Sequence, residues 1–299
     1  MDGDELVSKS ELTFCILVFN KTPWLRRSLL SIRKFCPGIS YSVKLLSQGK
    51  PDPKLLTLLE ELDDDKIELL TSPVNLGVDG GRKFLENQVE TPLTMMLDDD
   101  MYLTANSIQL ARDIMQTNAQ IGALSMPQYD PAGSLISPGG QNLSIRNGVI
   151  SMFQPSLTSS SYMEINHIDG GAMLYRTTMR EQFQWDDHSG FLQDLDKSMQ
   201  ILLSTKWKQA IVTSAMLIHD RSWVGKIPNY EGTRFNGLTL YRNYEYFRRK
   251  WGLRLNLRTH VLYEVVYPAL TLTRFPITIS QLDKFIRSGK RKIPIPVKR

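Results

Sequence analysis

Short strand-forming runs alternate with amphipathic helical segments along the first 100 residues of this 299-residue chain. The first run, LTFCILVF at 12–19, is apolar without interruption, which is typical of a strand buried on both faces of a sheet. Strands that alternate with helices in this way predict an α/β fold with a doubly wound, mainly parallel central sheet flanked by helices. The further strands are expected at 41–47, 66–72 and 92–97, and the helices at 24–35, 52–62 and 82–89.

The pattern becomes less regular after residue 101. No linker interrupts residues 12–219, so we expect one domain at 1–225 and a separate extension at 226–299. In the second part of that domain we expect a helix at 106–117, a strand at 121–129, hairpins at 130–150, a strand with a Gly-Gly interruption at 165–176, a helix at 193–205 and a long strand at 208–220.

The tetrapeptide LDDD occurs twice, and its neighbours distinguish the two copies. The copy at 62–65 connects a helix to a strand and is interpreted as a polar turn. Asp98, Asp99 and Asp100 follow the apolar run LTMML, and ligands of open parallel sheets bind outside the carboxyl ends of the strands. Because alternate residues of an extended segment point to one side, Asp98 and Asp100 can converge on a divalent cation. A solvated acidic turn is the alternative.

The acidic triplet and the motifs around it resemble those of GT-A glycosyltransferases, particularly the inverting family-2-like enzymes. The resemblance extends from about residue 12 to 219, and it implies a Rossmann-like GT-A fold with a donor half at about 12–104 and an acceptor half at about 105–225. It implies metal-dependent, inverting transfer of a sugar from a nucleotide-sugar donor to a hydroxyl of a saccharide, glycolipid or other glycoconjugate. The motifs are LVFN, NLGVDGGR, LDDDMYL, IDGGAMLYR, FQWDD, QDLDKSM and IHD.

The resemblance also implies which residues carry the chemistry. Mn²⁺ or Mg²⁺ would be held by Asp98, Asp100 and His219 against the donor diphosphate. Asp194, in QDLD, matches the position of the general base that takes the proton of the acceptor hydroxyl. The alternative for Asp194 is a capping role at the start of its helix. Gln193 stands where the family often has an acidic residue.

Substrate-binding residues are implied by the same motifs. Gly170 and Gly171 would let the substrates approach the backbone, and a β-bulge explains this glycine pair equally well. Trp185 either stacks on a sugar or packs in the core. Ser47 and Gln48 replace the acidic turn that usually contacts the base, so the base stays open. The donor-binding set is Asn20, Asn75, Gly77, Arg82, Asp98 and Asp99, and the acceptor-binding set is Gly170, Gly171, Trp185 and Asp186.

The departures at Gln193 and Gln48 motivate a second hypothesis. A degenerate GT-A site would make this chain a non-catalytic nucleotide-sugar or carbohydrate-binding protein. Donor binding without turnover would distinguish that protein from an enzyme.

The positive charge of the chain is concentrated at its C-terminal end. Residues 241–299 contain 14 Lys and Arg against 3 Asp and Glu, a net charge of +11, whereas the preceding residues carry 22 − 28 = −6. Aromatic residues alternate with Arg in YRNYEYFRRKWGLRLNLR, which predicts a basic helical extension. Such a surface suits peripheral contact with a membrane or a second copy of the chain. Nucleic acid is the least favoured partner because no recognised binding motif is present.

Location and redox state follow from the remaining features. The apolar run VLYEVVYPALTLTRFPITI is interrupted by Glu264, Pro268 and Arg274, so it does not reach the length of a spanning helix. No secretory signal is visible, and Cys15 and Cys36 match no zinc or redox motif. We therefore expect a cytoplasmic protein with membrane association through its extension.

Overall fold

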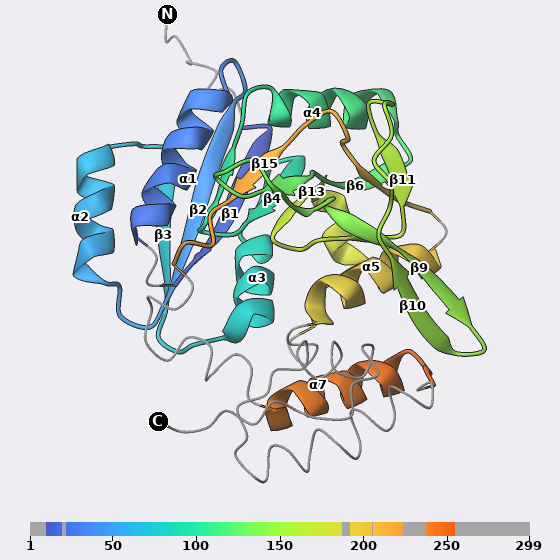
Figure 1. The fold of residues 1–299 in the computed structure, drawn as a ribbon. Helices are drawn as coiled ribbons and strands as arrows, with labels where there is room; N and C mark the ends of the chain where they lie inside the picture. The colour runs from blue at the N-terminus through green and yellow to red at the C-terminus, as the bar shows by residue number, and fades with distance from the viewer. Residues whose placement is uncertain (1–9, 20–21, 187–191, 205, 224–236, 255–299) are drawn as a thin grey trace, which may run out of the picture.

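The computed structural model describes residues 10–19, 22–186, 192–204, 206–223 and 237–254 (Figure 1). The predicted alternation of strands and helices in the first 100 residues is confirmed. The elements are β1 (Leu12–Val18), α1 (Thr22–Phe35), β2 (Tyr41–Gln48), α2 (Pro53–Leu62), β3 (Ile67–Ser72), α3 (Gly77–Asn87) and β4 (Leu93–Leu97).

The positions of both ends of α2 are explained by local hydrogen bonds and backbone conformation. The Asp52 carboxylate accepts a hydrogen bond from the Lys54 amide, and Pro53 occupies the first turn. At the other end Asp63 adopts the left-handed conformation, with φ 41°, and its amide bonds the Leu59 carbonyl. The first LDDD copy is therefore a helix-terminating turn, as predicted.

Helix α3 begins at Gly77, five residues before the predicted start at 82. We expected a loop there because glycine costs about 1 kcal/mol in a helix interior. Tertiary packing overrides that preference, since a Cβ at Gly81 would lie 2.6 Å from Cδ2 of Leu17. Glycine lets α3 approach β1 closely.

The second part of the chain adds antiparallel strands and two further helices. It contains β5 (Met101–Leu103), α4 (Ser107–Thr117), β6 (Ile121–Ser125), β7 (Gln128–Tyr129), β8 (Leu135–Ser137), β9 (Gly140–Arg146), β10 (Val149–Phe153), β11 (Met163–Ile165), β12 (His167–Ile168), β13 (Ala172–Arg176), the 3₁₀ turn at Thr177–Glu181, α5 (Gln193–Ser204), β14 (Lys208–Ile211), β15 (Leu217–His219) and α7 (Gly237–Lys250).

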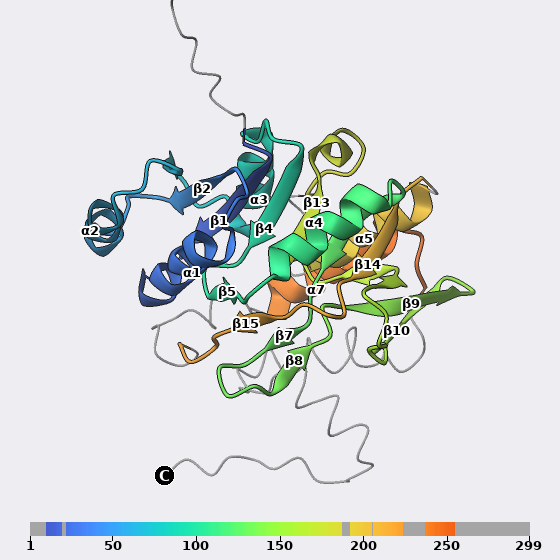
Figure 2. The same ribbon diagram turned by 90° about the horizontal axis from the view of Figure 1, so that it is seen from above.

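Within the described residues the main sheet has eight strands in the order β11-β14-β6-β13-β4-β1-β2-β3. Strand pairing shows that β3, β2, β1, β4, β6 and β14 run in one direction, while β13 and β11 run in the other. The prediction of a mainly parallel sheet is confirmed. Two small sheets, β10-β9-β12 and β5-β15-β7-β8, lie beside it (Figure 2).

Two predicted strands are broken in the structure. The expected strand at 208–220 turns at 213–214, so that β14 belongs to the main sheet and β15 pairs with β5. The expected strand at 121–129 is interrupted before β7 at Pro127, which has no amide hydrogen for a sheet ladder. In both cases an apolar run supplies two different sheets.

Separate hydrophobic clusters cover the two faces of the main sheet. Phe14 and Ile16 of β1 pack on one face with residues of α1, α2 and α4. Cys15, between them, points to the other face and joins a cluster that includes Leu85 of α3 and Ile201 of α5. This alternation follows from the two-residue period of a strand.

A third, smaller cluster joins α7 to the preceding domain. It is formed by Leu143, Leu195, Met199, Phe247 and Leu253, from β9, α5, α7 and the residues after α7. The predicted boundary at 225/226 and most of the predicted extension lie outside the described residues, but 237–254 pack against the domain. None of the helices in the described parts of the chain has the length and apolar character needed to cross a membrane.

Candidate active site

The glycine pair at 170–171 is the meeting point of three predicted site residues. The Gly170 amide donates to Oδ2 of Asp194 at 3.3 Å, and a Cβ at Gly170 would lie 2.6 Å from Nη1 of Arg82 and 2.8 Å from Cβ of Asp194. The Gly171 carbonyl accepts from the Asp98 amide at 2.8 Å, and a Cβ there would lie 2.7 Å from Oδ2 of Asp98. Any other residue pair would displace this cluster, so close approach explains the glycines.

Arg82 and Asp98 form the polar part of this cluster. Nη2 of Arg82 donates to Oδ1 of Asp98 at 2.8 Å. The Arg82 side chain is almost fully buried, whereas that of Asp98 is 37% exposed. A buried guanidinium with a fixed fork of N–H groups beside an accessible carboxylate suits recognition of a diphosphate.

Trp185 packs rather than presenting a ring to solvent. Its side chain is only 1% exposed, with the Arg82 guanidinium 5.0 Å and the Lys197 ammonium 4.4 Å from its ring centroid. Of the two alternatives for Trp185, stacking on a sugar or packing in the core, the structure shows packing, and the ring supports Arg82 through a cation–π contact.

Asp99 and the loop at 75–77, both predicted to bind the donor, are fixed by hydrogen bonds from backbone amides. Oδ2 of Asp99 accepts from the Phe19 amide at 2.9 Å, which ties the triplet to the end of β1. Oδ1 of Asn75 accepts from the Gly77 amide at 2.8 Å, and Gly77 has φ +72°. Asn20, also predicted to bind donor, lies outside the described residues.

Gln48 has a role that the sequence did not reveal. It stands where an acidic, base-contacting residue was expected, and its Oε1 accepts from the Leu76 amide at 2.6 Å. The side chain thus fixes the start of α3 to the carboxyl end of β2. Only the departure from the family pattern marked this position in the sequence.

Asp100 and His219 are neighbours through the pairing of β5 with β15. His219 Nε2 lies 3.6 Å from Oδ1 of Asp100, and Oδ2 of Asp100 accepts from the Trp223 indole. His219 Nδ1 faces Oε1 of Gln128 at 3.1 Å. An amide oxygen only accepts, so Nδ1 carries the proton, and Nε2 accepts from Nε of Arg221 at 3.5 Å.

The chain of contacts continues from Gln128 to Asp169. Nε2 of Gln128 donates to Oδ2 of Asp169 at 3.2 Å, and the Ser137 hydroxyl also donates to that oxygen. Burial raises the pKa of the Asp169 carboxyl, the Ser137 hydrogen bond opposes this rise, and the nearby charge of Asp194 adds to it. The motif DGGA pointed to this segment, but the carboxylate itself was missed.

The predicted metal ligands are brought together only in part. In the described ranges no three His, Cys, Asp or Glu side chains are grouped as they would be to hold a metal ion. The backbone turns at the triplet, where the Met101 amide bonds the Asp98 carbonyl at 3.0 Å, so Asp98 and Asp100 do not project side by side as an extended segment would require. Asp100 and His219 are the pair whose atoms fit a cation together with ligands from a substrate.

The two aspartates of QDLD face different partners. Asp194 points to Gly170, whereas Asp196 is 0% exposed and accepts from Nε2 of Gln200 at 2.9 Å, Nζ of Lys250 at 2.8 Å and Nε1 of Trp251 at 2.8 Å. Residues two apart on a helix do not share a face. Asp186, which was predicted to bind the acceptor, likewise accepts hydrogen bonds from residues of α7.

A buried ion pair links α3 to α5 beneath the site. Nζ of Lys197 donates to Oε1 of Glu86 at 2.6 Å, and the Tyr175 hydroxyl donates to the same oxygen at 2.7 Å. Burial lowers the pKa of Lys197, and the charge of Glu86 partly restores it. Glu86 is four residues after Arg82 and Lys197 three residues after Asp194, so the pair sets the position of one site helix relative to the other.

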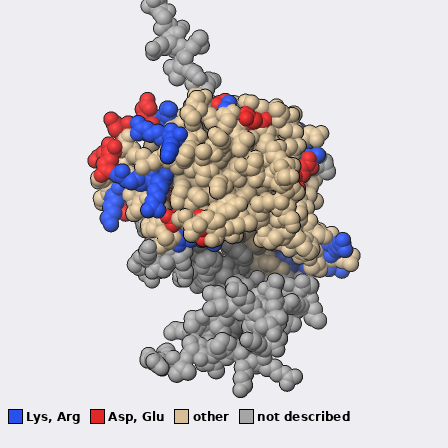
Figure 3. Space-filling model, turned by 45° about the horizontal axis from the view of Figure 1, so that its top comes forward, with Lys and Arg blue, Asp and Glu red and all other residues tan. Residues whose placement is uncertain are grey.

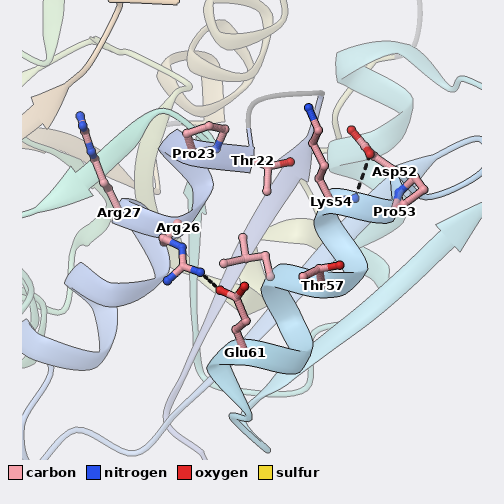
Figure 4. Close-up of a pocket in the computed structure, with 10 residues that line it drawn as sticks. Thr22, Pro23, Arg26, Arg27, Asp52, Pro53, Lys54, Thr57 and Glu61 are labelled. Atoms are coloured by element: carbon pink, nitrogen blue, oxygen red, sulfur yellow. Dashed lines mark hydrogen bonds and ion pairs between the residues drawn. The ribbon is translucent and has the colours of Figure 1, made fainter.

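A cavity of about 670 Å³ lies beside α1 and α2 (Figure 4). Charged side chains of both signs gather on that side of the molecule (Figure 3). Arg26 and Glu61, on the cavity wall, form an ion pair (Figure 4). None of the predicted site residues that the structure describes lines this cavity. Arg27, on its wall, reaches Oδ2 of Asp220 at 2.6 Å, next to His219.

Comparison by sequence gives no match to a family model and no match to a curated protein. Comparison by structure does give matches. GalNAc-T7, crystallised with UDP, GalNAc and Mn²⁺, superposes with a TM-score of 0.63 at 13% identity, over 93% of this chain and 54% of that chain. TarS residues 1–349 from S. aureus, in complex with UDP-GlcNAc, superposes with a TM-score of 0.60 at 12% identity, over 94% of this chain and 76% of that chain.

These matches bear on the fold. This chain spans about half the length of the GalNAc-T7 chain, and both matched proteins are GT-A glycosyltransferases. Both superpositions extend over more than nine-tenths of this chain. The protein therefore has the GT-A fold of these glycosyltransferases.

Proposed function

We propose that this protein is a metal-dependent, inverting glycosyltransferase that moves a sugar from a nucleotide-sugar to a hydroxyl acceptor. The observation that supports this most is the cluster at Gly170, which places a buried guanidinium, an accessible carboxylate and a separate carboxylate from α5 around one small backbone surface. The GalNAc-T7 and TarS crystal structures contain UDP or UDP-GlcNAc, which makes a UDP-sugar the first donor class to test.

In the proposed reaction, Arg82 binds the donor diphosphate. Its fork already donates to the Asp98 carboxylate, so the diphosphate takes over a preorganised site rather than ordering a free side chain. Asp98 and Asp99 then flank the donor, with Asp99 held in place by the Phe19 amide. The loop at Asn75 and Gly77 completes the donor end.

Asp194 is the proposed general base. It takes the proton of the acceptor hydroxyl as that oxygen attacks the anomeric carbon opposite the leaving diphosphate, which inverts the configuration. The hydrogen bond from the Gly170 amide orients the carboxylate and the glycine leaves space for the substrates. Gly171 and Asp186 are proposed to border the acceptor.

Mn²⁺ or Mg²⁺ would be held by Asp100 and His219, and it would offset charge on the leaving diphosphate when bound. Gln128 fixes the imidazole tautomer in which Nε2 is unprotonated, so Nε2 would bind the metal in place of accepting from Arg221. The nature of the acceptor, contact with a membrane and association with a second copy stay predictions.

A donor screen with matched variants tests this function. Wild-type protein is incubated with a panel of nucleotide-sugars and Mn²⁺, and binding and nucleotide release are measured. Asp194→Asn should bind donor normally but transfer roughly 10²- to 10⁴-fold more slowly. Asp63→Asn makes the same chemical change in the helix-terminating turn and should behave as wild type.

Two outcomes would contradict the proposal. Donor binding without release or transfer for any donor and acceptor would favour the non-catalytic binding protein. Full activity of Asp194→Asn would remove this residue as the base while leaving the donor assignment intact.

A further inference from the structure

Helix α7 is anchored to α5 by apolar and polar contacts together. Phe247 of α7 and Leu253, which follows the end of that helix, belong to the same small hydrophobic cluster as Leu195 and Met199 of α5. Figure 1 shows α7 lying below α5, on the side away from α4. The basic, aromatic sequence that suggested a membrane surface is thus used, in part, within the molecule.

Asp196 is the polar centre of this interface. Its carboxylate is fully buried, and an uncompensated buried charge is strongly destabilising. Two of its three described hydrogen-bond donors, Lys250 and Trp251, come from α7 and the residue that follows it, and only Gln200 belongs to α5. The buried charge of Asp196 is therefore neutralised and fully hydrogen-bonded only when α7 is in place.

Lys250 also contacts a second carboxylate. Its Nζ lies 2.6 Å from Oδ2 of Asp186, which accepts from the Tyr246 hydroxyl at 2.8 Å. Burial lowers the pKa of Lys250, but the hydrogen bonds to Asp186 and Asp196 outweigh it and leave the pKa raised. One ammonium group thus joins a residue eight positions before Asp194 to a residue two positions after it.

The remaining face of this turn carries the proposed base. Asp194 points to Gly170 while Asp196 points to α7, so a shift of the turn towards or away from α7 moves the Asp194 carboxylate relative to Gly170. A displacement of about 1 Å at a reacting group can cost roughly a hundredfold in rate.

We propose that Lys250 is a positioning residue, which with Tyr246 and Trp251 braces Asp186 and the first turn of α5 so that Asp194 is held against the acceptor. This brace rests on the proposed transferase function. It assigns α7 to the acceptor end of the site. The donor end, formed by Arg82 and Asp98, has no described contact with Lys250.

The test compares two substitutions on the same helix in the full-length chain. Lys250→Met removes the bridging ammonium. Arg249→Met is the matched control, because the Arg249 side chain is 75% exposed and pairs with Glu245. Steady-state transfer, donor affinity and amide hydrogen exchange at 193–198 are measured for each.

Lys250→Met should lower kcat for transfer by roughly tenfold to a hundredfold and change donor Kd by less than about twofold. Exchange at 193–198 should become faster. Lys250→Arg should recover most of the loss, since it keeps a cation within reach of both carboxylates. Arg249→Met should match wild type in all three measurements.

Milder variants cover the case in which Lys250→Met fails to fold. Trp251→Phe keeps a ring in the interface but removes the Nε1 donor to Asp196, and Tyr246→Phe removes the hydroxyl donor to Asp186. Each should show a smaller loss in kcat and the same faster exchange.

Failure of the brace can be told apart from failure of the function. Equal kcat and equal exchange in Lys250→Met and Arg249→Met would overturn the brace even if wild-type protein transfers sugar. If wild-type protein transfers no sugar, the proposed transferase function is wrong, but hydrogen exchange at 193–198 still tests the contact between α7 and α5. Faster exchange in Lys250→Met than in Arg249→Met supports the brace, and equal exchange in the two variants overturns it.

Discussion

The guanidinium of Arg82 and the carboxylate of Asp98 form a 2.8 Å ion pair that joins α3 to the acidic triplet after β4. The other guanidinium nitrogen faces Gly170, and the Trp185 ring lies against the group. Arg82 is thus fixed from three sides before any substrate binds. A diphosphate that binds here would therefore cause little further loss of side-chain conformational entropy at Arg82.

Replacing Arg82 by Met should weaken donor binding. Loss of a hydrogen-bonded cation costs about 2 kcal/mol, which corresponds to roughly thirtyfold in Kd. Calorimetric titration of a UDP-sugar measures this. Arg26→Met, in the cavity beside α1 and α2, removes a half-exposed arginine outside the cluster and should leave Kd unchanged. Equal affinities of the two variants would exclude Arg82 from the donor site.

Gly170→Ala should reduce transfer by about tenfold or more, because the added methyl group would overlap both Arg82 and Asp194. In Gly80→Ala the methyl group meets only Cβ of Leu76, at 3.1 Å. Measuring both kcat/KM and the thermal midpoint distinguishes an effect on the site from a loss of stability. A loss of kcat/KM in Gly80→Ala as large as in Gly170→Ala would argue against crowding at the cluster.

Lys197→Met should destabilise the fold by about 3–5 kcal/mol, because it leaves the Glu86 carboxylate buried without its cation. The double variant Lys197→Met/Glu86→Gln should recover part of that loss, since no uncompensated charge is left. Urea denaturation gives the free energies of unfolding for the double-mutant cycle. Additive effects of the two substitutions would show that the ion pair contributes no coupling.

Gln128→Leu should lower Mn²⁺ affinity by about tenfold to a hundredfold, because His219 loses the hydrogen bond that fixes its tautomer. Manganese binding in the presence of UDP can be followed by electron paramagnetic resonance. Gln109→Leu, on the exposed face of α4, is the control, since its amide contacts Asp113 and Arg112 only among the described side chains. Unchanged Mn²⁺ affinity in Gln128→Leu would remove His219 from the metal site.

The fold was largely predictable because burial leaves a simple trace in the sequence. A strand covered on both faces, such as 12–18, is an unbroken apolar run, and the helices between such strands show one apolar stripe. The GT-A fold itself came from the order of motifs. These signals are local and do not depend on which distant segments meet.

What the sequence did not predict depends on distant partners. The segment at 208–220 was interpreted as one strand, and only pairing of β15 with β5 reveals that His219 belongs to a second sheet beside Asp100. Asp169 and Gln128 are 41 residues apart and show their connection only in three dimensions. Two of the hydrogen-bond partners of Asp196 lie 54 and 55 residues further along the chain.

The hydrogen bonds from Lys250 and Trp251 to Asp196 have a consequence for synthesis of the protein. A nascent chain that has left the ribosome as far as β15 contains the whole main sheet, yet Gln200 is then the only one of the three described donors to Asp196 that has emerged. The turn that carries Asp194, the proposed base, reaches its final hydrogen bonding only after residue 251 emerges. Assembly of the sheet and completion of this turn are thereby separated in time, by the translation of about thirty further residues at about 5–20 residues per second.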